Sequence, residues 1–313
     1  MNHQRSGFVN NPGSILPDPR NADILVWVGN GLKPRAEAKV SVFDSVVQGG
    51  DAVWEGLRVY DGRIAELDAH LDRLSDSAKA MAFDSIPARE SVKAAVFETL
   101  EANGMRDGAH IRLTLTRGEK ITSGMNPRNN RSGPCLIVLA EWKPPVYGAR
   151  MLRLISSSVR RNSAQCLDSK IHHNNLINNI LACIEANAAG ADGALMLDLN
   201  GFVAETNDTN VFLAKRGSIV TPTADSCLPG VTRRMVIEIA REEAIPVEER
   251  NVSLTEIYAA DEVFTTGTMG ELAPVAEVDG RRIGEGRAGS MTRRLQELHR
   301  RRALERGEPL PSE

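Results

Sequence analysis

One carboxylate in this sequence stands where it needs a partner. The apolar run at residues 194–199 meets Asn200-Gly201, the dipeptide that best suits a tight type I′ turn, and returns as residues 202–204. This pattern predicts a β-hairpin closed by Glu205. Polar loop residues follow, and then a further apolar run at residues 211–214. Glu205 is therefore expected near the interior, where an ionised carboxylate requires a cationic group to face it.

A second group of residues suits an anion. The sequence Leu228-Pro229-Gly230-Val231-Thr232 precedes residues that recur at helical spacing, namely Met235, Val236, Ile239 and Ala240. A helix start offers unpaired N–H groups and the positive end of the helix dipole, and the Thr232 hydroxyl adds a donor, so a phosphate would fit here. An ordinary capped surface helix is the alternative.

A ligand with both a protonatable ring nitrogen and a phosphate would use both features, and pyridoxal phosphate is such a ligand. It also requires a lysine for covalent attachment. Lys170 lies ahead of a predicted helix, whose expected buried stripe is Leu176, Ile180, Leu181 and Ile184. An amine at a helix start gains nothing from the helix dipole and has reason to lose its proton, although a solvated lysine is the alternative.

Five separated motifs resemble the class IV aminotransferases, the fold-type IV family that depends on pyridoxal phosphate and includes branched-chain and D-amino-acid transaminases. In the family's order, the motifs are H-L-D-R-L at residues 70–74, Lys170 ahead of N-N-L-I-N-N-I-L-A, V-x-E-T-x-x-x-N-V-F at 203–212, L-P-G-V-T-R at 228–233 and F-T-T-G-T-M-G-E at 264–271. The resemblance covers roughly residues 22 to 300.

The resemblance assigns roles around the cofactor. It implies that Lys170 carries the cofactor and serves as catalytic base and acid, while Glu205 keeps the ring nitrogen protonated. The phosphate site that it implies consists of Arg73, Val231, Thr232, Gly267 and Thr268. For Arg73, helical spacing alone predicts a surface ion pair with Asp72 or Asp76, whereas the resemblance makes this side chain a bidentate phosphate ligand.

The strand expected at residues 109–117 alternates apolar and polar side chains. His110 and Arg112 share its polar face, which forms either a pocket wall or an exposed face of an antiparallel sheet. The resemblance implies that Arg112 binds the substrate carboxylate, and Arg128 in the following loop is the rival for that duty. Other substrate-site residues that it implies are Trp54, His110, Trp142 and Met269.

The implied substrate pocket has lost aromatic walls. Branched-chain transaminases line their side-chain pocket with tyrosines, and the matching positions here hold Gly49, His110, Pro145 and Asn175. A missing methylene-sized contact costs only ~1–3 kcal/mol, so a wider and more polar pocket predicts broad specificity.

The activity that the resemblance implies is ping-pong transfer of an amino group from a branched-chain-like amino acid to 2-oxoglutarate or pyruvate. A D-amino-acid or (R)-amine transaminase is an alternative on the same site, and so is aminodeoxychorismate lyase. A non-catalytic module that binds a phosphorylated ligand is the alternative from another class.

These residues need a scaffold that brings distant segments together. The resemblance implies an α+β fold of two domains with the cofactor between them. An irregular arm is expected at residues 1–21, a smaller N-terminal domain at 22–145 and a larger C-terminal domain at 146–313, because W-K-P-P-V-Y-G at 142–148 interrupts an apolar run. The family unit is a homodimer, and the resemblance extends this assembly to the present chain.

Local patterns predict the individual elements. Strands are expected at residues 23–28, 38–43, 52–60 and 109–117, with a strand buried on both faces at 135–140. Helices are expected at 67–81 and 290–304, the second ending in a frayed, charged tail. The segment Trp54-Glu55-Gly56-Leu57-Arg58 resembles the family's segment that lines the substrate pocket, and for Glu55 a solvated strand residue is the alternative.

Composition excludes several classes of partner. The chain has 313 residues, of which 42% are hydrophobic, and its 38 basic residues are scattered and offset by 41 acidic ones. This balance favours neither nucleic acid nor an anionic membrane. The first residues lack the apolar segment of a secretory signal, which favours a cytoplasmic protein. The four cysteines lack metal or disulfide spacing, and His172 and His173 are adjacent, so no metal site is expected.

Overall fold

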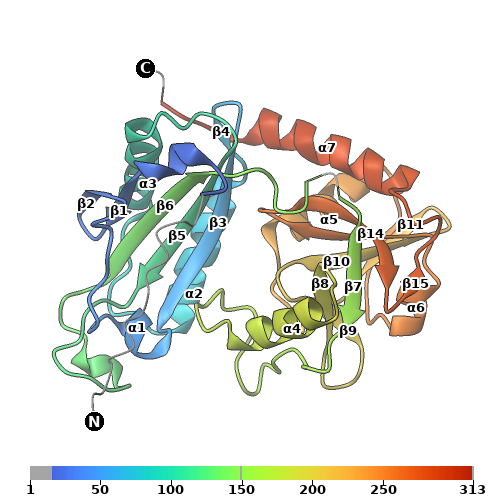
Figure 1. Cartoon of the computed structure of the whole chain (residues 1–313), viewed down its shortest axis with the longest axis horizontal. Helices are drawn as coiled ribbons and strands as arrows, with labels where there is room; N and C mark the ends of the chain where they lie inside the picture. The colour runs from blue at the N-terminus through green and yellow to red at the C-terminus, as the bar shows by residue number, and fades with distance from the viewer. Residues whose placement is uncertain (1–15, 149, 312–313) are drawn as a thin grey trace, which may run out of the picture.

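The computed structural model describes residues 16–148 and 150–311, which form an α+β fold built on two β-sheets (Figure 1). The expected arm at residues 1–21 therefore lies mostly outside the described residues. The first sheet has the strand order β16-β4-β3-β5-β6-β1-β2. Its strands are β1 (Leu25–Val28), β2 (Gly31–Pro34), β3 (Ala52–Tyr60), β4 (Arg63–Ile64), β5 (Ala109–Thr116), β6 (Cys135–Trp142) and β16 (Glu308–Pro309).

Helices cover one face of this sheet. The helical segments in this part of the chain are η1 (Pro19–Ala22), α1 (Ser45–Gly49), α2 (Leu67–Ala80), α3 (Arg89–Ala102) and η2 (Pro127–Asn129). Apolar residues of α2 and α3 join Ile111, Leu113 and Leu115 of β5 in one buried core. The alternate residues of β5 lie on the opposite face, because successive side chains of a strand point to opposite sides.

The second sheet has the order β12-β11-β10-β13-β14-β7-β8-β9, with β15 paired to β14. Its strands are β7 (Leu152–Ser156), β8 (Gly193–Leu197), β9 (Val203–Thr206), β10 (Asn210–Lys215), β11 (Ser218–Thr221), β12 (Val247–Glu249), β13 (Glu262–Gly267), β14 (Glu271–Val278) and β15 (Arg281–Arg282). The helices of this part are α4 (Ile177–Ala188), α5 (Val231–Glu242), α6 (Leu254–Tyr258) and α7 (Ser290–Arg306). No helix in the described ranges is long and apolar enough to cross a membrane.

Residues 300–311 form the end of α7 and strand β16, so the expectation of a frayed tail was wrong for these residues. Helix α7 runs across the top of the molecule from the second sheet to the first (Figure 1). Arg302 pairs with Glu238 and Glu242 of α5, which fixes the helix. After α7, β16 pairs with β4 and Leu310 enters the first core. The last strand thus belongs to the sheet of the first domain, and the predicted division at residues 145 and 146 did not include this return.

Two strand expectations were also wrong. Residues 38–43 form no strand: Asp44 donates its N–H to the carbonyl of Ser41, and this turn leads into α1. Strand β6 is buried at every second residue and not on both faces. Its apolar run faces the first core with one side only, because the helices cover one face of the sheet.

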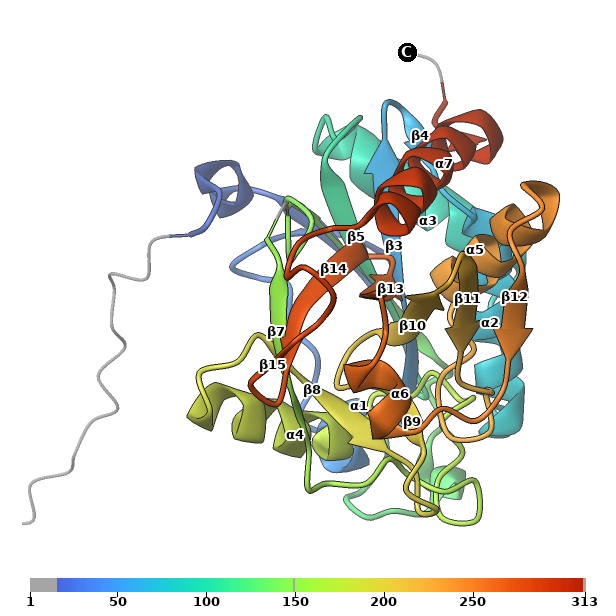
Figure 2. The ribbon, with the colours of Figure 1, turned by 90° about the vertical axis from the view of Figure 1, so that its right-hand side faces the viewer.

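The stripe expected to be buried on α4 is exposed. The helix packs onto β8 through the small residues Ala182 and Ala186. Its larger apolar side chains face outward, and their exposed fractions are 64% for Ile177, 53% for Ile180, 47% for Leu181 and 56% for Ile184. Figures 1 and 2 place α4 and α1 at the same lower end of the molecule.

Candidate active site

A cavity of about 220 Å³ is lined by residues from both sheets. Strand β3 and helix α2 contribute Trp54, Gly56 and Arg73. The second part of the fold contributes β9 and β10, the start of α5 and the turn between β13 and β14. The cavity therefore collects segments that lie far apart in the sequence.

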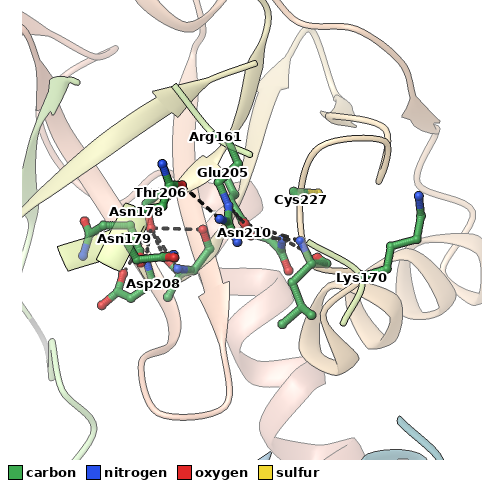
Figure 3. A network of polar contacts seen from close by, with 12 residues as sticks. Arg161, Lys170, Asn178, Asn179, Glu205, Thr206, Asp208, Asn210 and Cys227 are labelled. Carbon is green, nitrogen blue, oxygen red and sulfur yellow. Dashed lines mark hydrogen bonds and ion pairs between the residues drawn. The ribbon is translucent and has the colours of Figure 1, made fainter. Parts of the chain in front are cut away.

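Glu205, on β9, is 5% exposed and lines this cavity. Arg161 donates its Nε–H to Glu205 Oε1 over 2.6 Å, and Asn210 donates to Oε2 over 3.1 Å (Figure 3). The backbone N–H of Leu228 also points at this carboxylate. Burial raises the pKa of Glu205, and the Arg161 guanidinium opposes that rise. The expectation that a cation faces Glu205 is confirmed.

Helix α5 begins at this cavity. Gly230 is its N-cap and provides no side-chain hydrogen bond, so the first N–H groups of the helix face the cavity uncapped. A Cβ on Gly230 would lie 2.1 Å from Asn210 Oδ1, so any side chain there would displace the Asn210 amide that bonds Glu205. Thr232 is 6% exposed and lines the cavity beside Val231. This geometry differs from that of a capped surface helix.

Arg73 reaches the cavity from α2, held by a buried carboxylate. Its Nε–H and Nη2–H donate to Glu55 Oε1 and Oε2 over 2.8 and 2.6 Å, and Nη1 donates to the Pro229 carbonyl. Glu55 is 0% exposed, which excludes the alternative of a solvated strand residue. The surface pairing of Arg73 with Asp72 or Asp76 is likewise replaced by this buried pair.

The turn between β13 and β14 completes this end of the cavity. Gly267, Thr268, Met269 and Gly270 all line it. A Cβ on Gly267 would lie 2.9 Å from Thr209 Cγ2, which explains the glycine. The Thr268 hydroxyl oxygen lies 3.5 Å from His70 Nε2. All five residues expected at a phosphate site therefore line one cavity.

Lys170 is the exception among the expected cofactor residues. It is exposed, does not belong to the lining residues, and its side chain extends away from Glu205 in Figure 3. Its backbone is fixed, because its N–H donates to Asp168 and the following residues pair with β3. Lys170 also lies near Cys227, whose pKa burial raises to about 12 and the lysine charge partly lowers. The helix after Lys170 begins at Ile177.

Two of the expected substrate residues form a stacked pair. The guanidinium carbon of Arg112 lies 3.4 Å from the ring centre of Trp54, and Nη2 donates to Asn174 Oδ1 over 3.0 Å. Burial lowers the pKa of Arg112 to about 10, so it remains a cation at neutral pH. Trp54 lines the cavity. Arg128 is exposed in η2.

His110 and Trp142 lie on opposite faces of the first sheet. His110 is paired with Arg58 of β3 and lies on the Arg112 face, and its Nε2 has no hydrogen-bond partner among residues 16–148 and 150–311. Trp142 is paired with Ala109, packs against the first core and has Arg20 over its ring. The structure therefore does not place Trp142 at the cavity, because the two-residue alternation of β6 directs it the other way.

Sequence reasoning missed three residues at this site. Arg161 was expected only as an unlocated cation. His172, dismissed as a metal ligand, lines the cavity and packs against Trp54, with ring centres 4.0 Å apart and ring planes tilted by 39°. Tyr147 also lines it and donates its hydroxyl to Asp208 Oδ2 over 2.6 Å. Tyr147, two residues after Pro145, therefore provides an aromatic wall, which partly corrects the expectation that the pocket has lost its tyrosine walls. The sequence signal that could have identified Tyr147 is the rarity of tyrosine, since the chain contains only three.

Among the described residues no group of three or more His, Cys, Asp or Glu side chains could hold a metal ion. Burial raises the pKa of Asp208, which Tyr147, Thr206 and Thr209 counter by hydrogen bonding. The site thus combines buried carboxylates with the uncapped N–H groups at the start of α5 and the hydroxyl groups of Thr232 and Thr268.

Comparisons with known proteins agree with this arrangement. The model of the amino-transferase class IV family matches residues 52–278. Branched-chain-amino-acid aminotransferase-like protein 2 of Arabidopsis thaliana is 59% identical over 302 residues, which cover 96% of this chain and 54% of that protein. The chain thus spans about half the length of this relative. A putative branched-chain-amino-acid aminotransferase of Methanocaldococcus jannaschii is 43% identical over 273 residues, covering 87% of this chain and 94% of that protein.

A solved structure is similar over most of the fold. The T.th. branched-chain amino acid aminotransferase, complexed with N-(5′-phosphopyridoxyl)-L-glutamate, is 36% identical with a TM-score of 0.82. The match covers 88% of this chain and 93% of that one.

Proposed function

We propose that this chain, which belongs to the class IV aminotransferase family, is a pyridoxal phosphate-dependent transaminase that moves an amino group from an amino acid to a 2-oxo acid. One observation carries the proposal: a single cavity joins the buried carboxylate of Glu205 to the uncapped start of α5. Such a cavity suits a ligand with a basic ring nitrogen at one end and a phosphate at the other.

The residues present fit pyridoxal phosphate. Gly230 leaves the first N–H groups of α5 without a side-chain cap, Val231 and Thr232 line the cavity at this helix start, and Arg73 and Thr268 are lining residues of the same cavity. Gly267 is the remaining phosphate-site residue. Glu205 would face the ring nitrogen. When bound, the cofactor supplies an aldehyde for amino-group exchange and a ring that accepts electrons from the substrate α-carbon.

The chain's own residues would then have separate tasks. Glu205 would hold a proton on the ring nitrogen, and Arg161 would keep the carboxylate in place. Lys170 would carry the cofactor and take and return the substrate α-proton through its amine, for which its exposed side chain must turn toward the cavity. Arg112 would bind the substrate carboxylate, with Arg128 as second choice.

For the substrate we propose branched-chain-like amino acids accepted with broad specificity. The relatives named as branched-chain aminotransferases support this class, and Trp54, Met269 and Tyr147 provide apolar lining. Gly49, Pro145 and Asn175 are not among the residues that line the cavity. Of the described residues that do line it, Tyr147 is the one tyrosine. His110 and Arg112 would make the carboxylate end polar.

A donor panel tests this function. L-leucine, L-valine, D-alanine and (R)-1-phenylethylamine would each be offered with 2-oxoglutarate or pyruvate. Turnover of the two L-amino acids is expected. Turnover confined to the last two donors would remove the branched-chain assignment. Catalytic release of pyruvate from added aminodeoxychorismate, without any acceptor, would indicate a lyase instead.

A homodimer is part of the proposal. The exposed apolar side chains of α4 and those near α1, Val42, Phe43 and Val47, form a surface that a second copy would cover. Light scattering on Leu181→Asp tests it. The wild type should be dimeric and the variant should dissociate, whereas a monomeric wild type would contradict the proposal. Location in the cytoplasm stays a prediction from the sequence.

A further inference from the structure

The buried carboxylate of Glu55 connects two histidines and one arginine. His70 Nδ1 lies 2.6 Å from Glu55 Oε2, and His172 Nδ1 lies 3.0 Å from Oε1. Arg73 donates two further hydrogens to the same carboxylate. Burial opposes ionisation, yet His172 and Arg73 hold the pKa of Glu55 well below its usual range. Glu55 is therefore an anion that only accepts hydrogen bonds.

This acceptor fixes the direction of the hydrogen bonds. Both His70 and His172 must carry a hydrogen on Nδ1, because an ionised carboxylate has none to donate. The opposite nitrogen of His70, Nε2, lies 3.5 Å from the Thr268 hydroxyl oxygen. A chain of contacts thus runs from Glu55 through His70 to Thr268, which lines the cavity.

The protonation of His70 decides what Thr268 can offer to the cavity. A hydroxyl group has one hydrogen. If His70 Nε2 is unprotonated, Thr268 donates that hydrogen to it and presents only oxygen lone pairs to an anion. If His70 Nε2 is protonated, it donates to Thr268, and the hydroxyl hydrogen is free for the anion.

Charge balance favours the second state when a dianion is present. Arg73 is the cation nearest this relay, but Glu55 already neutralises it through two hydrogen bonds. The uncapped N–H groups of α5 supply only partial positive charge. A phosphate dianion at this end therefore requires one more cation, and a proton on His70 supplies it next to the hydroxyl that would bind the anion.

We propose that Glu55, His70 and Thr268 form a proton-linked positioning relay, in which anion binding at the cavity is accompanied by protonation of His70. The proton enters at Nε2 from solvent and no other bond changes. The inference rests on the proposed function in that the anion is taken to be the cofactor phosphate. Its charged or titratable neighbours are Glu55 on β3, Arg73 on α2 and His172 in the segment before α4. Burial, together with the nearby Arg73 charge, lowers the pKa of His172 to about 4, so His172 is neutral at neutral pH.

Sulfate is the probe that tests the relay, because it remains a dianion around neutral pH and brings no proton of its own. The full chain, freed of any bound cofactor, would be titrated with sulfate in buffers of different ionisation enthalpy, with calorimetry as the readout. Where the sulfate-free protein carries no proton on His70 Nε2, each sulfate should bind together with about one proton. The affinity for sulfate should then fall about tenfold for each unit by which the pH rises. The ¹⁵N signals of His70 should move to those of an imidazolium on saturation.

Variants separate the relay from a purely structural role. His70→Gln still donates to Glu55 but cannot take up a proton, so its sulfate affinity should lose the pH dependence. Thr268→Val keeps His70 and should also lose the uptake, whereas Thr268→Ser should retain it. His299→Gln, in α7 and not among the cavity-lining residues, is the matched control and should keep the pH dependence.

Binding that is independent of pH in the wild type would overturn the relay, and so would proton uptake that survives His70→Gln. These measurements involve no amino-group exchange. A protein that turns over none of the donors but takes up a proton with sulfate would contradict the proposed function and support the relay. A protein that turns over the donors but binds sulfate without a proton would support the function and contradict the relay.

Discussion

Arg161 donates its Nε–H to Glu205 Oε1 over 2.6 Å, and both side chains are 6% exposed. A permanent cation therefore lies against the carboxylate proposed to face the cofactor ring. Burial raises the pKa of Glu205, and the charge of Arg161 opposes that rise. Asn178 in turn accepts a hydrogen bond from Arg161 Nη1 and fixes the guanidinium.

Removing this cation should destabilise the fold. Arg161→Met leaves Glu205 buried without its ion-pair partner, which typically costs about 3–5 kcal/mol. Equilibrium unfolding by denaturant measures the loss. The double variant Arg161→Met with Glu205→Gln should recover part of it, because the buried charge is then gone. Strictly additive effects of the two substitutions would show that the pair is not coupled.

Glu205→Gln should remain folded and bind the cofactor but lose activity. Glutamine keeps a hydrogen-bonding group near the ring nitrogen but removes the negative charge that holds a proton there. The turnover rate should fall by about 100-fold or more. Steady-state kinetics checks this, with cofactor content measured on the same sample. Turnover close to that of the wild type would remove Glu205 from the mechanism.

Arg112 should control affinity for the substrate carboxylate. Arg112→Lys keeps the charge but loses the planar group that stacks on Trp54 and donates in two directions. The KM for L-leucine should rise by about 10- to 100-fold. Arg128→Ala, at an exposed residue, is the matched control and should leave KM unchanged. A large effect of Arg128→Ala with none from Arg112→Lys would transfer the role to Arg128.

Stability should fall in acid because two histidines are buried as neutral groups. Burial, with Arg73 and Arg112, lowers the pKa of His172 to about 4, and burial with Lys143 and Arg58 lowers that of His110 to about 3. Histidine in the unfolded chain titrates near ~6.5, so the unfolded state binds more protons below that pH. Their contribution is thus complete above about pH 6.5 and is lost as the pH falls toward 4.

The size of this acid-dependent loss of stability can be measured for one residue, His172. For His172, the difference between ~6.5 and about 4 corresponds to roughly 3 kcal/mol at about 1.4 kcal/mol per pKa unit. Denaturant unfolding at several pH values would compare the wild type with His172→Gln, which keeps a donor for Glu55. The variant should show a shallower acid loss. An unchanged pH dependence would contradict the burial of a neutral His172.

Local signals predicted the parts of the site that depend on neighbouring residues. The Asn200-Gly201 turn located Glu205 on a hairpin, and the Gly230 to Thr232 segment marked the start of α5. Arg161 and Glu205 are 44 positions apart, and His172 and Glu55 are 117 apart, so no periodicity links them. Their pairing exists only because the two sheets bring β3, β9 and the segment before α4 to one cavity.

Periodicity also leaves open what covers an apolar face. The stripe on α4 was interpreted correctly as one face of a helix, but Ala182 and Ala186 pack onto β8 and leave Ile180 and Leu181 outside. Likewise the apolar run of β6 suggested burial on both faces, whereas only one face of its sheet is covered by helices. Both errors arise because burial depends on packing partners that a single segment does not encode.

The attachment of the cofactor to Lys170 is the most direct test of the proposed function. The visible spectrum of the purified protein would be recorded with pyridoxal phosphate before and after borohydride, followed by peptide mapping. The visible absorbance of the bound cofactor should change on reduction, and the pyridoxyl label should be found on Lys170. Lys170→Ala should bind the cofactor without attachment and lack turnover, because the phosphate-site residues remain. A label on Lys143 or Lys215, or a wild type that takes up no cofactor, would contradict the account.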